Sequence, residues 1–394
     1  MVDSTPQTPS ELVAWMKSRG VIHDARIEDA FLKVPREPFL PNVPLEQIYL
    51  DEAIPIKRDP EGQVISSSSQ PSMMALMLEQ LEVKEGQNIL EIGTGSGYNA
   101  AIMHHLVGKN GRVTTIEYDP DVAEQAVRNL QKLTLSEVMV VRGDGALGFA
   151  PRASYDRIIA TVGIWDVPNA WIRQLKPRGI LVTPIWLDTL QISAAFRLQP
   201  DDTLLSHSNQ MCAFVRLRGT AAGPDVRVKI GRSLYLHTNY IERIDTASLH
   251  MLLSEYPEEG YLGEFFRSSD FFNGFIPYLA MNVESPSLFV TYYTADDQQP
   301  YGLQESGFAL LNVGSACFVP MRGEGKAYSF GSADSLMVLQ DHLSAWRAVG
   351  KPFTDRLRLK LHPMNRVLPE IEIGRWFKRS DHAVHAWYED ETTR

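Results

Sequence analysis

The sequence predicts an α/β fold in which a mostly parallel sheet is followed by an added α+β domain. Between residues 88 and 186, short apolar runs alternate with amphipathic segments, which is the pattern of right-handed βαβ units. After about residue 219 this rhythm stops and apolar–polar alternation takes over, as in half-buried antiparallel strands. We therefore expect two domains, residues 1–219 and 220–394, as the length also suggests.

Hydrophobic periodicity places the individual elements. Residues 9–33 show two apolar stripes separated by Gly20, which indicates two helices. In the rest of the first domain we expect strands at 88–92, 112–117, 138–141, 155–160 and 180–186, and helices at 98–107, 121–133 and 170–175. In the second domain we expect strands at 226–236, 287–293, 308–319 and 356–361, and a helix at 332–350 that ends before Gly350.

Composition narrows the class of protein. The chain is 44% hydrophobic and 22% charged, contains no run of about 18 apolar residues and has no secretory signal, so we expect a cytoplasmic protein without a membrane partner. A net charge of −10 argues against a nucleic-acid partner. Cys212 and Cys317 lie far apart without further ligands nearby, so we expect neither a disulfide nor a metal site.

A glycine-rich loop is the strongest local signal for a ligand. Residues Glu91–Gly97, Glu-Ile-Gly-Thr-Gly-Ser-Gly, lie between a predicted strand and a predicted helix. Glycines there let a ligand approach the backbone closely, and the start of the helix carries a partial positive charge. Dinucleotide enzymes use similar loops, and a tight turn without a ligand is the plainer alternative.

Carboxylates after three successive strands favour S-adenosylmethionine over a nicotinamide cofactor. Glu117 ends the second strand, where an acidic side chain is placed to accept hydrogen bonds from a ribose. Asp144 follows the third strand and is placed to accept from an adenine amino group. Glu91 adds a negative charge suited to the ammonium and sulfonium groups of the cofactor. Taken singly, each residue also fits a surface or turn position.

At this point the sequence resembles the protein-L-isoaspartate O-methyltransferase family. The resemblance covers roughly residues 9–219 and rests on five stretches in order, at 34–41, 49–56, 63–73, 90–97 and 155–179. It implies a Rossmann-like, seven-stranded class I methyltransferase core. It also implies S-adenosylmethionine as methyl donor, with S-adenosylhomocysteine as product, and a peptide or protein bearing Asp or isoAsp as acceptor.

The resemblance also assigns roles to individual residues. The cofactor site would comprise Ile65, Glu91, Gly93, Thr94, Gly95, Ser96, Gly97, Glu117, Tyr118, Asp144 and Gly145. Ser66 and Ser69 would act beside the acceptor carboxylate, and the acceptor would be bordered by Ser67, Ser68, Val162 and Trp165. A carboxylate has a pKa near ~4 and is already ionised, so a hydroxyl that orients it is sufficient without a general base.

Two departures from the family pattern leave alternatives open. Ser67 to Ser69 intervene before the Gln-Pro helix start, so the serine that faces the acceptor is undecided, and Ser66 or Ser69 alternatively caps that helix. Trp165 stands where the family usually has small residues. It makes the acceptor rim larger and aromatic, or it packs beneath a loop.

The extension at 220–394 adds about 175 residues to the usual core. It resembles extensions of family members found with ribosomally made peptides (lasso peptides, lanthipeptides and graspetides). These methylate one aspartate and so prime aspartimide formation, and the extension would recognise the peptide. The alternatives are general L-isoaspartyl repair and, from another class, an inactive S-adenosylmethionine- or peptide-binding module. A nicotinamide dehydrogenase is a further alternative.

The C-terminal region is basic and aromatic. Residues 375–379, Arg-Trp-Phe-Lys-Arg, precede His382, His385 and Trp387. Cationic and aromatic side chains together suit an acidic peptide. Ordinary packing of aromatic side chains along a strand edge explains the same pattern.

Overall fold

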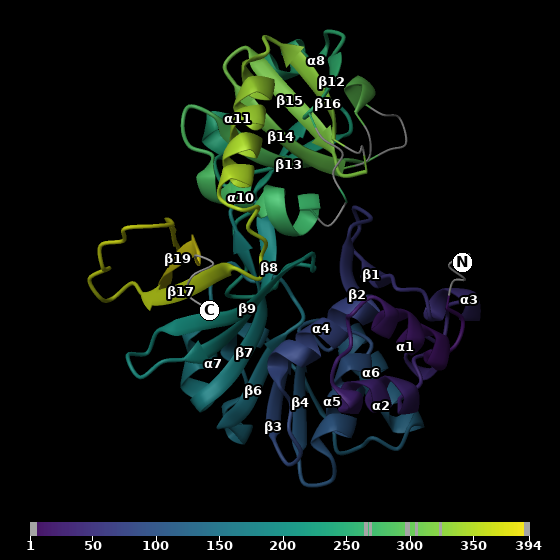
Figure 1. Cartoon of the computed structure of the whole chain (residues 1–394). Coiled ribbons are helices and arrows are strands. Elements are labelled where there is room, and N and C mark those ends of the chain that lie inside the picture. Colours follow the sequence, from purple (N-terminus) through teal and green to yellow (C-terminus); the bar gives the residue numbers. More distant parts are fainter. Residues whose placement is uncertain are drawn as a thin grey trace.

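Two β-sheets organise the chain in the computed structural model, which describes residues 6–263, 267, 270–295, 300–303, 306–322 and 325–389. Figure 1 shows the larger sheet with its helices in the lower part of the view and the smaller sheet above it. A two-stranded hairpin of β1 (Ile54–Arg58) and β2 (Val64–Ser68) stands apart from both sheets.

The larger sheet has ten strands in the order β18-β19-β17-β9-β8-β7-β6-β3-β4-β5. From β5 to β7 all neighbours are parallel, and from β7 to β18 all are antiparallel. The seven strands from β5 to β9 confirm the predicted α/β core. The strand bounds are β3 Asn88–Ile92, β4 Arg112–Glu117, β5 Met139–Arg142, β6 Tyr155–Ala160, β7 Leu175–Leu187, β8 Leu190–Leu198, β9 Leu204–Cys212, β17 Leu357–Pro363, β18 Arg375–Lys378 and β19 His382–Tyr388.

Both faces of the parallel strands are buried, which is why their sequences read as continuous apolar runs. Ile89 of β3 packs into a core with the N-terminal helices, whereas its neighbour Leu90 packs into the core on the other face. The helices of this part are α1 Pro9–Ser18, α2 Ala25–Lys33, α3 Leu45–Ile48, α4 Pro71–Leu81, α5 Tyr98–Val107, α6 Pro120–Lys132 and α7 Asn169–Gln174.

The smaller sheet is antiparallel, in the order β10-β11-β13-β14-β15-β16-β12. Its strands are β10 Arg227–Ile230, β11 Leu234–His237, β12 Glu258–Tyr261, β13 Leu288–Thr294, β14 Ser306–Asn312, β15 Ser315–Pro320 and β16 Lys326–Gly331. The helices with it are α8 Thr246–Leu253, α10 Ile276–Asn282 and α11 Asp334–Ala348. Leu339, Leu343 and Trp346 of α11 are buried in a core that also includes strands of the larger sheet.

Two predicted strands are hairpins in the structure. The segment 226–236 divides into β10 and β11 around Gly231, and 308–319 divides into β14 and β15 around Gly314. Both glycines have positive φ, +59° and +71°, a conformation that suits a tight reversal. The prediction was wrong at these turns because apolar and polar residues keep alternating through a short turn.

The C-terminal strands belong to the larger sheet rather than to the smaller one. β17 pairs with β9, and the contact is fastened by Asn209 Nδ2, which donates to the Leu357 carbonyl at 2.7 Å. The expected extension 220–394 is thus divided in space: 227–331 forms the smaller sheet, and 357–388 continues the larger one. Within the residues that the structure describes, no helix has the length and apolarity needed to cross a membrane.

We predict that the two sheets unfold together because they share a core. Phe275 is fully buried, and its ring centroid lies 5.6 Å from that of Trp346 and 6.3 Å from that of Phe308. Phe275→Ala should lower the free energy of unfolding by about 3–5 kcal/mol. Phe272→Ala, at a side chain that is 37% exposed, should change it by less than about 1 kcal/mol. Denaturant titration checks this, and equal effects of the two substitutions would contradict the shared core.

Candidate active site

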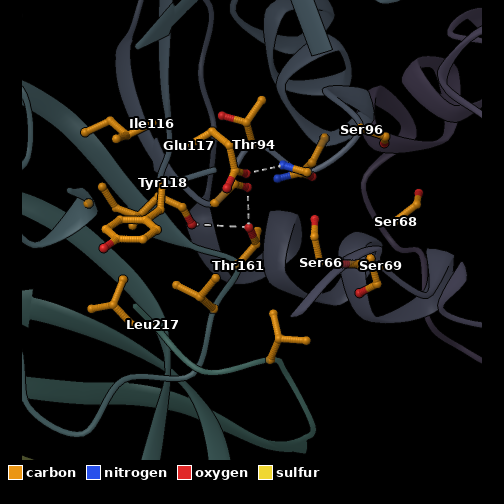
Figure 2. A pocket seen from close by; sticks show the side chains of 18 of the residues that line it. Ser66, Ser68, Ser69, Thr94, Ser96, Ile116, Glu117, Tyr118, Thr161 and Leu217 are labelled. Atoms are coloured by element: carbon orange, nitrogen blue, oxygen red, sulfur yellow. Dashed lines mark hydrogen bonds between the residues drawn. The ribbon is translucent and has the colours of Figure 1, made fainter. Parts of the chain in front are cut away.

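A cleft with an empty volume of about 720 Å³ lies at the carboxyl ends of β3 and β4. Figure 2 shows loop residues Thr94 and Ser96 on one side and the serines of the β1–β2 hairpin on the other. Carboxyl ends of parallel strands are the usual place for a ligand in such sheets. Its lining residues are Ile65 to Ser69, Met74, Ile92 to Ser96, Tyr98, Asn99, Ile116 to Tyr118, Gly145, Thr161, Val162 and Val215 to Arg218.

The glycine loop has a backbone that other residues rarely adopt. Gly93 and Gly95 have φ values of +99° and +53°. A Cβ at position 93 would lie 2.8 Å from the Thr161 hydroxyl oxygen, and a Cβ at 95 would lie 3.1 Å from the Ser67 carbonyl oxygen. The loop therefore needs glycine both for its conformation and for its contact with the serine hairpin.

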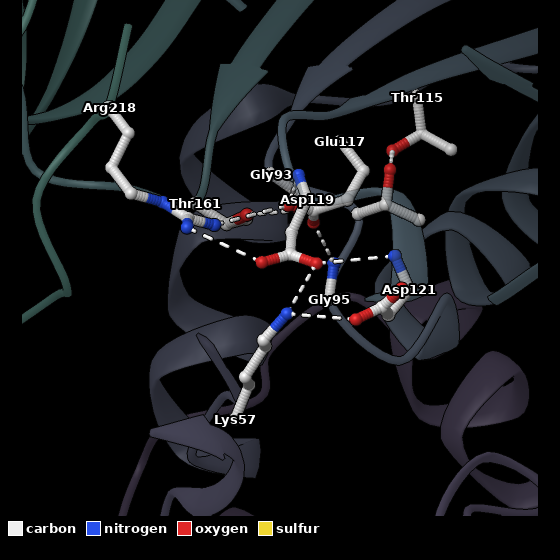
Figure 3. A network of polar contacts seen from close by, with 10 residues as sticks. Lys57, Gly93, Gly95, Thr115, Glu117, Asp119, Asp121, Thr161 and Arg218 are labelled. Atoms are coloured by element: carbon white, nitrogen blue, oxygen red, sulfur yellow. Dashed lines mark hydrogen bonds and ion pairs between the residues drawn. The ribbon is translucent and has the colours of Figure 1, made fainter. Parts of the chain in front are cut away.

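Glu117 is the acidic side chain that faces the cleft. Its carboxylate accepts hydrogen bonds from the backbone N–H groups of Gly95 at 3.0 Å and Asp119 at 3.1 Å. Arg218 lies 3.7 Å from the same carboxylate and covers the Tyr118 ring at 5.2 Å. These contacts hold the carboxylate in place beside the glycine loop (Figures 2 and 3).

An ion-pair network ties the serine hairpin to this corner of the cleft. Lys57 of β1 contacts Asp119 at 2.7 Å and Asp121 at 3.2 Å, and Arg218 reaches Asp119 at 3.5 Å (Figure 3). Burial raises the pKa of Asp119, but the hydrogen bond and charge of Lys57 outweigh it, so that the pKa lies below its usual value. The ionised pair thus fixes β1 relative to the end of β4.

Glu91 lies behind the glycine loop and does not line the cleft, although the sequence predicted a direct role in cofactor binding. The side chain is fully buried and accepts from Asn99 at 2.7 Å and from the Thr115 hydroxyl at 2.6 Å. Thr115 uses its one proton for Glu91, so Thr94 must donate to Thr115 across their 2.7 Å contact. Burial raises the pKa of Glu91 to about 7. Glu91 therefore supports the loop from beneath.

The Asp144 carboxylate is also engaged by the protein. It accepts from the Ala146 N–H at 2.9 Å and from both the N–H and the hydroxyl of Thr220 at 2.7 Å. Burial raises its pKa, but the bonds from Thr220 bring the pKa below its usual value. Gly145, which follows it, does line the cleft, and its carbonyl accepts from Trp171 Nε1 at 2.8 Å.

Two other predicted residues lie outside the lining. Gly97 begins α5 with φ +88° and faces Ala126 and Leu130 of α6. Trp165 packs under Arg379, whose guanidinium carbon lies 3.7 Å from the ring centroid. Arg379, in the turn between β18 and β19, covers the Trp165 ring. Trp165 therefore packs beneath a loop, which is the second of the two alternatives that the sequence left open.

The serines differ in what their hydroxyls contact. The Ser68 hydroxyl accepts from Arg36 at 3.3 Å, whereas the structure shows no hydrogen bond from the Ser66 or Ser69 hydroxyl to another described residue. Ser69 does not cap α4, because Asp51 accepts from the Ser72 N–H at 2.8 Å in that role. The Ser67 hydroxyl likewise shows no hydrogen bond to another described residue, so Ser66, Ser67 and Ser69 are the lining serines whose hydroxyls remain available to a ligand.

Several lining residues were missed from sequence. Val215 to Arg218 follow β9 and form the wall opposite the glycine loop, and Asn99 links the cleft to Glu91. No motif marks Val215 to Arg218. They reach the cleft through backbone pairing with the loop after β6, where the Gly163 N–H donates to the Val215 carbonyl at 2.8 Å and the Leu217 N–H donates to the Gly163 carbonyl at 2.9 Å. β8 and β9 were themselves not predicted, and β8 is buried along most of its length and shows no alternation.

The sheet order, the glycine loop and the cleft define a class I, S-adenosylmethionine-dependent methyltransferase. A family model described as protein-L-isoaspartate(D-aspartate) O-methyltransferase matches residues 7–222, more than half of the chain. The chain belongs to the protein-L-isoaspartate O-methyltransferase family and is a carboxyl methyltransferase.

Individual relatives agree with this assignment. The protein-L-isoaspartate O-methyltransferase of Methanopyrus kandleri is 41% identical over 209 residues, which are 53% of this chain and 90% of that protein. That of Thermotoga maritima is 39% identical over 196 residues, 50% of this chain and 61% of that protein. A solved structure of a protein-L-isoaspartate O-methyltransferase matches 90% of this chain and 96% of its own, with a TM-score of 0.52 and 28% identity.

We predict that Glu91 makes stability depend on pH. Its pKa is about 7 in the folded protein and about 4.5 when unfolded, so the folded state holds the extra proton between these values. Relative to Glu91→Gln, the free energy of unfolding should therefore fall by about 3 kcal/mol as pH rises from 4.5 to 7, and then level off. Urea unfolding across this range checks it; a difference that does not vary with pH would contradict the assignment.

We predict that Gly95→Val abolishes cofactor binding. The backbone at position 95 has φ +53°, which valine rarely adopts, and the new Cβ would lie 3.1 Å from the Ser67 carbonyl oxygen, so the loop must shift. Titration calorimetry with S-adenosylhomocysteine measures the loss. Gly62→Ala is the matched control, because Gly62 also has positive φ but its Cβ would meet nothing within 4 Å. Wild-type affinity in Gly95→Val would show that the ligand binds elsewhere.

Proposed function

We propose that this enzyme methylates the free carboxylate of L-isoaspartyl residues in peptides and proteins. The observation that supports this most is the cleft in which the glycine loop and Glu117 lie together with Ser66, Ser67 and Ser69, whose hydroxyls bond no other described residue. One side suits the methyl donor and the other suits a carboxylate. The family model and the relatives carry the same activity in their names.

The residues present fit S-adenosylmethionine. Glycines line the cleft with backbone atoms, so a ligand can approach the loop backbone closely. We assign Glu117 to the ribose hydroxyls and the backbone around Gly145 to the adenine. Thr220 occupies one oxygen of Asp144, and the other oxygen accepts one hydrogen bond, from the Ala146 N–H, so it retains the capacity to accept a second. The bound cofactor supplies an electrophilic methyl group on a positively charged sulfur.

The chain's own part in the reaction is to orient and desolvate the acceptor. A carboxylate oxygen forms the bond to the methyl carbon as the carbon–sulfur bond breaks, and no proton needs to be removed. Ser66 donates a hydrogen bond to the other carboxylate oxygen and so aligns the attacking one. Arg216, at the edge of the cleft beside the Trp186 ring, supplies positive charge that attracts an anionic acceptor.

The comparisons support L-isoaspartyl methylation over dedicated peptide tailoring. Peptide tailoring was the main prediction from sequence, and that prediction relied on the extension at 220–394. A solved structure that carries the isoaspartate name matches 90% of this chain, so the match reaches well beyond residue 222. An extension of this kind therefore does not by itself indicate a dedicated aspartate substrate or aspartimide formation.

The substrate class is tested with isomeric peptides. We expect methyl transfer to a synthetic peptide with one L-isoaspartyl residue and little transfer to the same peptide with L-aspartate, as mass spectrometry of the products would show. Transfer only to the L-aspartyl isomer would instead support the tailoring reading. A methyl ester that loses methanol to a stable succinimide would then point to aspartimide as the product.

We predict that Ser66→Ala lowers kcat about 10- to 100-fold, because one oriented hydrogen bond in the transition state is lost. Cofactor affinity should change little. The control is Ser68→Ala, whose hydroxyl is already engaged by Arg36. Steady-state rates on the L-isoaspartyl peptide separate the two. An unchanged rate in Ser66→Ala together with a slow Ser69→Ala would transfer the role to Ser69.

A further inference from the structure

The hairpin of β1 and β2 carries Ser66, yet it belongs to neither of the two large sheets. A two-stranded hairpin alone is at best marginally stable in water. Its position over the cleft must therefore come from side-chain contacts with the parts of the chain around it. In Figure 1 the hairpin reaches from the helices of the larger sheet toward the smaller sheet, so both domains are close enough to hold it.

The side of the hairpin next to the core is held by Lys57. Lys57 of β1 pairs with Ser66 of β2 in the antiparallel ladder. Its ammonium group contacts the Asp119 carboxylate, which is largely buried, at 2.7 Å (Figure 3). The Asp119 N–H in turn donates to Glu117 at 3.1 Å. The residue opposite Ser66 is thus tied to the segment that holds the Glu117 carboxylate beside the glycine loop.

The tip of the hairpin is a closed turn. The Asp59 carboxylate accepts from the Gln63 N–H at 2.7 Å, and the Asp59 N–H donates to the Gln63 carbonyl at 2.9 Å. The Arg58 guanidinium donates to the Gly62 carbonyl at 2.8 Å. These three bonds fix the backbone of Gln63, so a contact made by its side chain is transmitted to the strand that follows.

Arg227 of the smaller domain makes that contact. It lies in β10, and its Nη1 donates to Gln63 Oε1. The rest of the guanidinium is oriented by Asp225, whose two carboxylate oxygens accept from Nε at 3.0 Å and from Nη2 at 2.9 Å. Two parallel bonds to one carboxylate give a fixed geometry. The smaller sheet therefore presents one N–H group to the tip of the hairpin.

Ser66 lies between these two contacts. It pairs with Lys57, and it follows Gln63 by three residues, about 10 Å along an extended strand. Arg36 holds the opposite end of β2, next to α4. Contacts along the whole hairpin fix its direction as well as its place, and the direction matters because a hydrogen bond weakens steeply when it is bent. A misplacement of about 1 Å can cost about 100-fold in rate.

We propose that the smaller domain completes the methyl-transfer site by holding this hairpin, with Arg227 and Lys57 as positioning residues that orient Ser66 from two sides. The inference rests on the proposed function for the acceptor. It gives the region after residue 219 a role that requires no contact with the substrate. Partly exposed hydrogen bonds and ion pairs add little to global stability, so substitutions at these positions should change the reaction without unfolding the protein.

The first test measures kcat on a synthetic peptide with one L-isoaspartyl residue. Arg227→Ala should lower kcat about fivefold and Lys57→Ala about tenfold, because the Ser66 hydroxyl loses its orientation. In Arg227→Ala the Kd for S-adenosylhomocysteine and the midpoint of thermal unfolding should stay close to the wild-type values. Gln63→Glu should retain the rate, since a carboxylate also accepts from Arg227, whereas Gln63→Ala should lower it as Arg227→Ala does.

Two further variants separate this contact from general charge effects. Arg232→Ala is the matched control, because Arg232 is exposed in the turn between β10 and β11 and its loss removes the same charge from the same domain. Its kcat should equal that of the wild type. Arg227→Ala combined with Gln63→Ala should be no slower than either single variant, because residues that act through one contact are not additive.

Hydrogen exchange of residues 54–68 reports on the hairpin independently of the reaction. Exchange there should be faster in Arg227→Ala than in Arg232→Ala. A kcat of Arg227→Ala that equals that of Arg232→Ala would overturn the proposal, while methylation of the L-isoaspartyl peptide by the wild type upholds the proposed function. Faster exchange in Arg227→Ala, with no methylation of any peptide by the wild type, would uphold the hold on the hairpin and overturn the proposed function.

Discussion

The close approach between the glycine loop and the serine hairpin is the constraint on which this site depends. A methyl donor and a carboxylate must meet within bonding distance, so the segments that hold them must touch. A Cβ at Gly95 would lie 3.1 Å from the Ser67 carbonyl oxygen, a tight contact, and the N–H of the same glycine donates to Glu117. One residue thus sets the position of Glu117 and of the serine hairpin together.

Two buried ionisable side chains keep these segments in place. Arg36 is fully buried and donates to the carbonyls of Ile48 and Ser69 and to the Ser68 hydroxyl. Glu91 holds the loop from the opposite side through Thr115 and Asn99. Burying a charge is costly unless it is hydrogen-bonded, so both residues specify the local backbone more than they add to stability. This explains why Arg36 and Glu91 both fall within stretches that resemble the family.

Much of the fold could be predicted from the sequence, and the failures have physical causes. The strands at 88–92, 112–117 and 155–160 and the helix at 98–107 match the structure, because buried parallel strands and glycine-ended helices leave strong local patterns. Pairing between segments far apart in the sequence leaves no local pattern. β17 joins the larger sheet by pairing with β9, and hydrophobic periodicity cannot show which strands pair. For the same reason Arg216 to Arg218 were not predicted, although they line the cleft; the predicted Glu91 lies outside that lining.

A crystal structure with bound S-adenosylhomocysteine tests the central claim most directly. The account predicts that the ligand lies between Gly95 and Ser66, with its ribose hydroxyls on Glu117, its sulfur directed toward the serine hairpin, and Glu91 still covered by Thr94 and Thr115. A ligand held in another cavity, or one that contacts Glu91 while leaving Glu117 bound only to the protein, would contradict it.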